Sequence, residues 1–150
     1  MIREELKTQK DLKFFMAETS TKIELPIAIN KIPAGFPSPA DDYMEDRLDL
    51  NEKLIRNPSS TFFAKVSGHS MIDAGINDGD LLIIDKSLPP KDESVLVCAL
   101  NGEFTIKKLK KIGRDYYLMP ENRDFEPILL SEDNDFIVWG IVTYSIKKHF

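Results

Sequence analysis

Cysteine, histidine and long apolar runs are scarce in this chain of 150 residues. The one cysteine, Cys98, has no partner for a disulfide within the chain, which fits a reducing compartment. Together with His69 and His149 it gives too few ligands for a zinc site, and no phosphate-binding loop or dinucleotide fingerprint is present, so we expect neither metal nor cofactor. No segment reaches the ~20 apolar residues that span a bilayer, and the charged start lacks the apolar core of a signal peptide. We therefore expect a cytoplasmic protein without a membrane partner.

An excess of positive charge is missing as well. The formal net charge of -5 and the pI near 5.1 give no general attraction for nucleic acid or an anionic membrane, although KKLKKIGR is locally basic. The hydrophobic content of 42% suffices for one core in a chain of this length. The composition predicts one ordinary domain, with an additional arm.

The first part of the chain has few signals of regular structure. Residues 1–31 mix lysine and glutamate without sustained helical or strand periodicity, although LKFFMA is apolar enough to dock, so we expect an arm partly ordered by contact. The next segment, IPAGFPSPADDY, has prolines at 33, 37 and 39, each of which pushes the preceding residue toward an extended conformation. This predicts an exposed, strand-like ribbon, which is either a linker or a peptide that a protease reads.

Two short helices are predicted after the ribbon. Ser38 before Pro39 fits the N-cap and N1 positions, and Asp49 with Glu52 three residues later fits a capping box. The acidic run over residues 41–49 is interpreted as a solvated helical face, because nothing in it suggests paired catalytic carboxylates.

From Thr61 onward the pattern is that of strands, so the predicted fold class is mostly β. Short runs rich in Val, Ile, Phe and Tyr, bounded by Gly, Pro, Asn or Asp, read TFFAKVSG, DLLIID, SVLVCAL, EFTIKKLKKI, DYYLMPEN and DFIVWGIVTYSIKK. Asn101 and Gly102 supply the positive φ that a two-residue hairpin turn needs, so the third and fourth runs should pair.

Ser70 is the candidate nucleophile. It lies in SGHSMIDAGINDGD, a glycine-containing segment after a strand, where backbone amides can converge on an oxyanion. Taken alone, a serine in such a segment is more often a capping or turn residue. His69 is adjacent, so its side chain faces the opposite way in an extended segment, and His149 lies at the C-terminus. A Ser-His-Asp triad is therefore not expected.

A lysine is the remaining candidate for the base. Lys107 lies on a predicted interior strand with apolar neighbours, and burial can bring a lysine pKa from about 10.4 toward neutrality, where the amine acts as a general base. Alternation puts Lys107 and Lys108 on opposite faces, so at most one enters the interior; the alternative is that both are edge-strand charges. Cys98 is interpreted as a small buried hydrophobe rather than a nucleophile.

Together these motifs are similar to those of the LexA/UmuD family of self-cleaving serine peptidases, and to UmuD-like members in particular. GFPSPADDY, RLDLN, SGHSM, DGDLLIID and GEFTIKKL occur in the order of the family, and the resemblance covers residues 33–147. It implies a domain of curved antiparallel sheets with short helices, preceded by a cleavable extended arm. The implied boundary separates the arm, 1–34, from a peptidase and polymerase-subunit domain, 35–150.

The same resemblance implies the site residues. Ser70 is expected to be the nucleophile, Lys107 the general base and Ala34-Gly35 the bond that is cut. The backbone amides of His69 and Ser70 are expected to bind the oxyanion. UmuD-like proteins often have an acidic residue where this chain has His69, and we expect only a tuning effect because the backbone is what the family uses. The small residue before the cut suits a tight pocket.

The function that the resemblance implies is self-cleavage in the SOS response to DNA damage. RecA filaments on single-stranded DNA are expected to promote cleavage of the protein's own N-terminal arm. The shortened homodimeric product is expected to join a UmuC-like polymerase as a subunit of an error-prone translesion DNA polymerase. One alternative is a non-catalytic, polymerase-binding scaffold of the same fold. A LexA-like repressor is the other, but the 34 residues before the cut are too few for a winged helix-turn-helix, and no sequence-specific DNA binding is expected.

Overall fold

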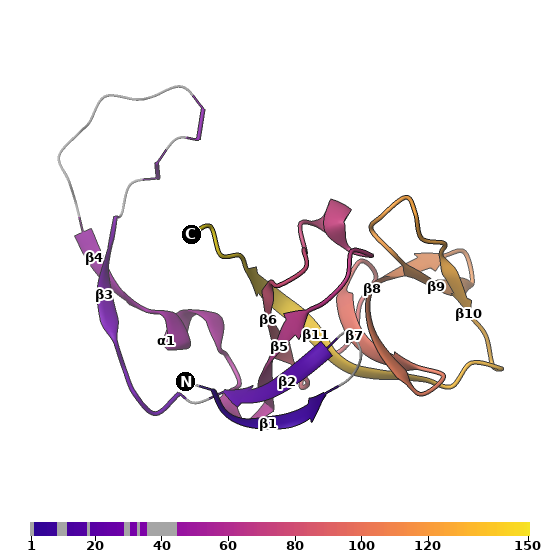
Figure 1. Cartoon of the computed structure of the whole chain (residues 1–150), viewed down its shortest axis with the longest axis horizontal. Coiled ribbons are helices and arrows are strands. Elements are labelled where there is room, and N and C mark those ends of the chain that lie inside the picture. Colours follow the sequence, from indigo (N-terminus) through magenta and orange to yellow (C-terminus); the bar gives the residue numbers. More distant parts are fainter. Residues whose placement is uncertain (1, 9–11, 18, 29–30, 33, 36–44) are drawn as a thin grey trace.

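The computed structural model of this chain describes residues 2–8, 12–17, 19–28, 31–32, 34–35 and 45–150, and strands dominate it (Figure 1). In chain order the strands are β1 (Ile2–Thr8), β2 (Leu12–Ala17), β3 (Glu24–Ala28), β4 (Glu45–Asp49), β5 (Thr61–Val66), β6 (Leu81–Asp85), β7 (Val95–Leu100), β8 (Glu103–Ile112), β9 (Asp115–Met119), β10 (Ile128–Leu130) and β11 (Phe136–Ile146). The helical elements are α1 (Leu50–Leu54) and the 3₁₀ turns η1 (Pro58–Ser60) and η2 (Ile72–Ala74). The predicted mostly β fold class is confirmed.

Nine of the described strands form one antiparallel sheet, in the order β1-β2-β5-β6-β11-β7-β8-β9-β10. Strand β11, the last in the chain, lies in the middle, where it pairs with β6 on one side and β7 on the other. The sheet is strongly curved, and β8, β9 and β10 curl around one end of the domain (Figure 1). Strands β3 and β4 form a separate two-stranded ribbon.

Two clusters of buried apolar side chains form the core. The first includes Ala64, Leu82, Ile84, Val97 and Ile106, and the second Leu96, Cys98, Leu109, Leu118 and Ile141. Alternation along β7 and β8 separates the clusters, because successive side chains of a strand face opposite sides of the sheet. Val97 is paired with Ile106 in the first cluster, while Leu96 is paired with Lys107. The register thus carries Lys107 on the face of β8 that holds the second cluster.

The N-terminal segment contributes strands that the sequence pattern did not predict. Strands β1 and β2 form a hairpin, and β2 pairs with β5 so that Phe15 lies opposite Phe63. The expected docking of LKFFMA is confirmed, since this hexapeptide is β2. Pairing with the edge of an existing sheet supplies backbone hydrogen bonds whatever the side chains are. These strands therefore form although the segment lacks the alternation of apolar and polar residues that marks a strand in the sequence.

The acidic run forms a strand where a helical face was predicted. Residues 45–49 are β4, in which Leu48 lies opposite Leu25 of β3. The predicted helical face is therefore wrong for these five residues, because cross-strand pairing outweighs the low strand propensity of Asp and Glu. Residues 41–44 and the helix start predicted at Ser38-Pro39 lie outside the described residues.

Helix α1 begins where the capping pattern predicted. The Asp49 carboxylate accepts a hydrogen bond from the Asn51 amide at 3.0 Å, which satisfies one of the free donors of the first turn. Glu52 forms an exposed ion pair with Lys22 at 3.7 Å. The N-cap half of the predicted capping box is thus confirmed.

The hairpin between β7 and β8 also follows the prediction. Asn101 has a φ of 50° and Gly102 a φ of 84°, so both turn residues adopt the positive values that this turn type requires. The six strand runs predicted after Thr61 all form strands, and the three-residue β10 is the one described strand in this region that was missed. No described helix is long and apolar enough to cross a membrane.

Candidate active site

Ser70 lies in the loop that joins β5 to η2. The chain turns at Gly68, whose φ of +100° is readily accessible to glycine, and the Gly68 amide donates to the Asp78 carboxylate at 3.0 Å. A second turn runs beside the first, because the Gly79 amide donates to the Val66 carbonyl at 2.8 Å. The two connected turns hold a half-buried Ser70 just beyond the end of β5.

Lys107 reaches Ser70 from the middle of β8. The lysine is only 8% exposed, and its Nζ lies 3.1 Å from Ser70 Oγ. The same nitrogen donates to Thr105 Oγ1 at 2.8 Å and to the Ile106 carbonyl at 3.0 Å. These three acceptors are uncharged oxygens. Desolvation at this site disfavours an ammonium relative to a neutral amine, whereas hydrogen bonds to these oxygens stabilise the ammonium.

Lys108 takes no part in this contact. Its Nζ lies 2.6 Å from a Glu121 carboxylate oxygen and 3.7 Å from one of Glu93. As alternation along the strand predicted, one lysine of the pair is buried beside Ser70 and the other forms ion pairs elsewhere. The alternative in which both lysines are edge-strand charges is wrong, because β8 lies between β7 and β9.

A small cavity of about 40 Å³ opens beside Ser70 Oγ. It is lined by Val66, Gly68, Ser70, Met71, Thr105 and Ile106, together with Ser67. A cavity of this size is suited to a small side chain such as that of alanine. The cavity is therefore a candidate for the tight pocket expected for the small residue before the cut.

The peptide groups around Ser70 are held by their carbonyl oxygens. The His69 carbonyl accepts from Asn122 Nδ2 at 2.7 Å, and the Ser70 carbonyl accepts from the Glu121 amide at 2.8 Å. Among the described residues, none accepts a hydrogen bond from the His69 or Ser70 amide. Both N–H groups are therefore candidates for the expected oxyanion donors, and the His69 side chain is exposed.

Ala34 and Gly35 are not brought to Ser70 in this structure. Both are exposed, and a side chain built on Gly35 meets no atom within 4 Å. Neither residue lines the cavity that contains Ser70. For the bond between them to reach Ser70 Oγ, the connecting segment has to change its position.

The Peptidase S24-like family model matches residues 26–143 of the chain. The chain belongs to this family. Protein MucA of Salmonella typhimurium is 43% identical over 126 residues, which cover 83% of this chain and 86% of MucA. Protein SamA of Salmonella typhimurium strain LT2 is 41% identical over 123 residues, covering 82% of this chain and 85% of SamA. The LexA repressor of Acidithiobacillus ferrooxidans is 36% identical over 138 residues, covering 90% of this chain and 65% of the repressor. The predicted membership in the LexA/UmuD family, as a UmuD-like protein, is confirmed.

The other reactive residues considered from the sequence form no hydrogen bond with Ser70 among the described residues. Cys98 is fully buried, and burial raises the pKa of its thiol to about 11, against the smaller opposing effect of Lys107. It packs as the small hydrophobe that was predicted. His149 is exposed near the C-terminus. In the part of the chain that the structure describes, no three His, Cys, Asp or Glu side chains gather as metal ligands.

Two residues at the site were missed by sequence reasoning. Thr105 precedes Lys107 by two positions and therefore shares its face of β8, so strand alternation alone was enough to suggest it. Asn122 is separated from His69 by 53 positions, and no local pattern connects the two.

Proposed function

We propose that this protein is a Ser-Lys peptidase that cuts its own Ala34-Gly35 bond. The observation that carries the proposal is the 3.1 Å contact between Ser70 Oγ and the Nζ of a lysine that is 8% exposed. A hydroxyl needs a base within hydrogen-bond reach to become a nucleophile, and a buried amine is such a base once it is neutral. Membership in the Peptidase S24-like family supports the same chemistry.

The reaction begins with proton transfer from Ser70 Oγ to the neutral Lys107 amine. The oxygen attacks the Ala34 carbonyl carbon, and the resulting oxyanion accepts hydrogen bonds from the His69 and Ser70 amides. Lys107 then returns the proton to the Gly35 nitrogen as the C–N bond breaks. Water hydrolyses the Ala34–Ser70 ester, with Lys107 again accepting a proton, and the serine is regenerated.

Two further contacts keep the lysine in place through this cycle. Thr105 Oγ1 and the Ile106 carbonyl lie 2.8 and 3.0 Å from Nζ, so they accept hydrogen bonds from the ammonium that forms transiently. A cation created inside a protein is costly unless polar groups solvate it, and these oxygens supply that solvation. The amine can therefore take up the serine proton without being drawn toward solvent.

The proposed substrate is part of the same chain as the Ser70 site, so cleavage can proceed even if the cleavage segment binds the site weakly. Residues 36–69 connect the bond to Ser70, and a chain of this length spans the domain with ease. Tethering replaces a bimolecular encounter by a high effective concentration, so the site does not need strong affinity for free peptides. Cleavage awaits docking of the Ala34 side chain into the small cavity beside Ser70.

Cleavage at Ala34 divides the chain into an arm, 1–34, and a domain, 35–150. The arm takes β1, β2 and β3 with it. Because β2 pairs with β5 and β3 pairs with β4, release of the arm frees one edge of the main sheet and leaves β4 without a partner strand. The product is therefore shorter than the precursor and also exposes strand edges that the precursor covers.

The biological setting we propose is the SOS response to DNA damage in the cytoplasm. Similarity to MucA, SamA and a LexA repressor supports it. RecA filaments on single-stranded DNA promote the cleavage, and the homodimeric product acts with a UmuC-like partner as an error-prone translesion polymerase. The described residues before β4 form three strands and no recognition helix, so they give no support to a repressor role.

An experiment in cells tests this setting. Wild-type protein and Ser70→Ala are each expressed, DNA damage is applied, and chain length is followed by immunoblotting with and without functional RecA. We expect residues 35–150 to accumulate in the wild type only, and only when RecA is functional. Full-length protein in every sample would favour a non-catalytic scaffold that binds the polymerase.

A further inference from the structure

The segment after β9 holds both carbonyl groups that flank the Ser70 backbone. Asn122 Nδ2 donates to the His69 carbonyl at 2.7 Å, and the Ile72 amide donates to the same oxygen at 3.3 Å. One residue earlier in the segment, the Glu121 amide donates to the Ser70 carbonyl at 2.8 Å. Residues 121 and 122 thereby fix the peptide groups on either side of the serine.

The His69 carbonyl and the Ser70 amide belong to the same peptide group. In a planar trans peptide the C=O and N–H bonds point in opposite directions. A hydrogen bond that fixes the direction of the His69 oxygen therefore also fixes the direction of the Ser70 N–H. That N–H is one of the two donors to the oxyanion in the proposed reaction.

Asn122 is itself held in one orientation. Its Oδ1 accepts from the Asp124 amide at 3.0 Å, an Asx turn that leaves Nδ2 directed at the His69 carbonyl. Both ends of the carboxamide are thus used as their chemistry requires, the oxygen as acceptor and the amino group as donor. An aspartate at this position keeps the turn acceptor and loses the donor to His69.

We propose that Asn122 is a positioning residue for the oxyanion donors. It touches neither the substrate nor the reacting atoms and acts through the His69–Ser70 peptide group. The role rests on the self-cleavage proposed above. Loss of an oxyanion donor costs about 10²–10³-fold in rate, and here the Ser70 amide remains but its peptide group loses the shorter of the two hydrogen bonds that fix its direction, so we expect a loss of about 10–100-fold.

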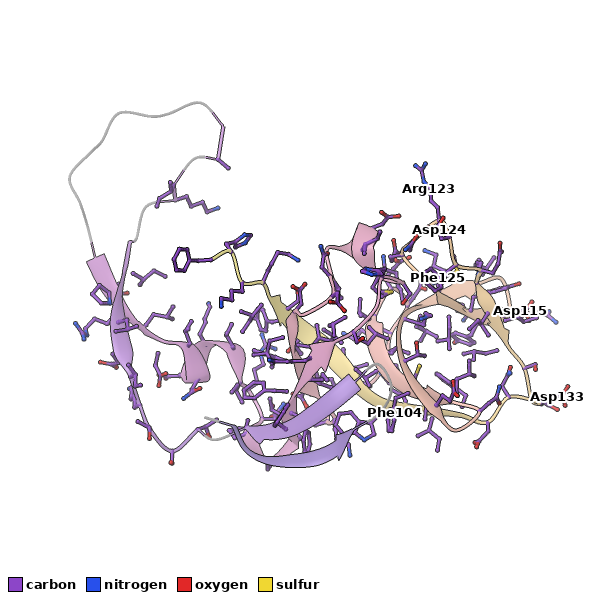
Figure 2. The ribbon with its side chains drawn as sticks, in the orientation of Figure 1. Phe104, Asp115, Arg123, Asp124, Phe125 and Asp133 are labelled. Atoms are coloured by element: carbon purple, nitrogen blue, oxygen red, sulfur yellow. The ribbon has the colours of Figure 1, made fainter. Side chains whose placement is uncertain are left out.

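Two substitutions isolate the donor. Asn122→Asp and Asn122→Ala both remove the hydrogen bond to the His69 carbonyl, and only the first adds a charge, so a loss common to both comes from the donor. Arg123→Ala is the matched control, because the adjacent Arg123 side chain is exposed and extends away from the loop (Figure 2). Ser70→Ala gives the rate without the nucleophile.

The full-length proteins are compared by three measurements: self-cleavage rate from pH 7 to 10 by intact mass, thermal unfolding midpoint, and the ¹³C resonance of the His69 carbonyl. We expect both Asn122 variants to cleave about 10–100-fold more slowly while Arg123→Ala matches the wild type. In Asn122→Ala the loss should be the same factor at every pH, since Lys107 is unchanged. The His69 carbonyl resonance should shift in both Asn122 variants.

The contrary results are distinct. Wild-type rates in both Asn122 variants overturn the positioning role and leave self-cleavage intact. If the pH profile of Asn122→Ala is displaced along the pH axis, the substitution has altered Lys107 as well, which overturns the positioning role. If Arg123→Ala loses as much cleavage rate as the Asn122 variants, the losses come from general loosening of the site, and the positioning role is again overturned. If the wild type fails to cleave at all, the proposed function fails and this role with it, while an unshifted His69 resonance would refute the hydrogen bond itself.

Discussion

Lys107 Nζ lies 3.1 Å from Ser70 Oγ, although 37 positions separate the two residues in the sequence. The lysine is carried inside the sheet by β8 and the serine by the loop after β5, so the contact exists only in the folded domain. The fold thereby keeps an amine within proton-transfer distance of a hydroxyl and largely away from water.

Replacement of Lys107 should stop self-cleavage without unfolding the domain. Lys107→Ala removes the only base assigned to Ser70, and general bases contribute about 10²–10⁴-fold, so we expect the rate to fall by at least about 100-fold. Lys107→Met keeps most of the side-chain volume and should lose activity equally. The measurement is the cleavage rate of each variant, together with its thermal unfolding midpoint.

The matched control for this substitution is Lys110→Ala. Lys110 is on the same strand and pairs with Glu93 at the surface. Exposed ion pairs contribute little to stability, so the domain should stay folded and the rate should stay within about twofold of the wild type. A Lys107→Ala protein that is folded and cleaves at the wild-type rate would show that the base is another group.

The rate of self-cleavage should rise with pH. Only the neutral amine of Lys107 accepts a proton, and its fraction increases about tenfold per pH unit until the amine is fully deprotonated, after which the rate levels off. Purified protein followed from pH 7 to pH 10 should therefore cleave faster at higher pH. A rate that is flat over this range would contradict a lysine base that is still protonated near neutrality.

The size of the residue before the cut should control the reaction. The cavity lined by Ser70 measures about 40 Å³, which suits the Ala34 methyl better than a large side chain. We expect the rate to fall through the series Ala34→Val, Ala34→Leu and Ala34→Trp, by about 100-fold at the end, because misplacing the carbonyl by about 1 Å has a cost of this order. Lys31→Ala serves as a control, because Lys31 is exposed and lies before the cut. Equal rates across the Ala34 series would show that the cavity does not bind the side chain of residue 34.

The buried thiol should make the domain less stable at alkaline pH. Burial raises the pKa of Cys98 from 9.0 to about 11, so between these values the folded state binds more protons than the unfolded chain. The free energy of unfolding should then fall by about 1.4 kcal/mol per pH unit from pH 9 to pH 11. Urea unfolding of the wild type and of Cys98→Ala at pH 8 to 11 measures the difference, which would be constant if the thiol titrated equally in both states.

Local patterns in the sequence were enough to predict much of the domain. The Asn101-Gly102 turn requires positive φ at two successive residues, and few other dipeptides provide it. The opposite fates of Lys107 and Lys108 follow from alternation along one strand. The assignment of Ser70 and Lys107 to one site came from resemblance to a family, because no local rule joins a loop to a strand so far away.

The features that were missed depend on long-range contacts. Strand β2 is ordered by the edge of β5, and residues 45–49 form a strand because β3 lies beside them. Neither partner can be inferred from the charged segments themselves. The contact of Asn122 with the His69 carbonyl likewise appears only once the loop after β9 is placed against the Ser70 loop.

The central claim is tested most directly by incubating purified wild-type protein and Ser70→Ala at pH 10 and measuring their intact masses over time. We predict that the wild type alone loses the mass of residues 1–34, which identifies the nucleophile and the bond together. Cleavage of both proteins at the same bond, or at a different bond in the wild type, would contradict the account.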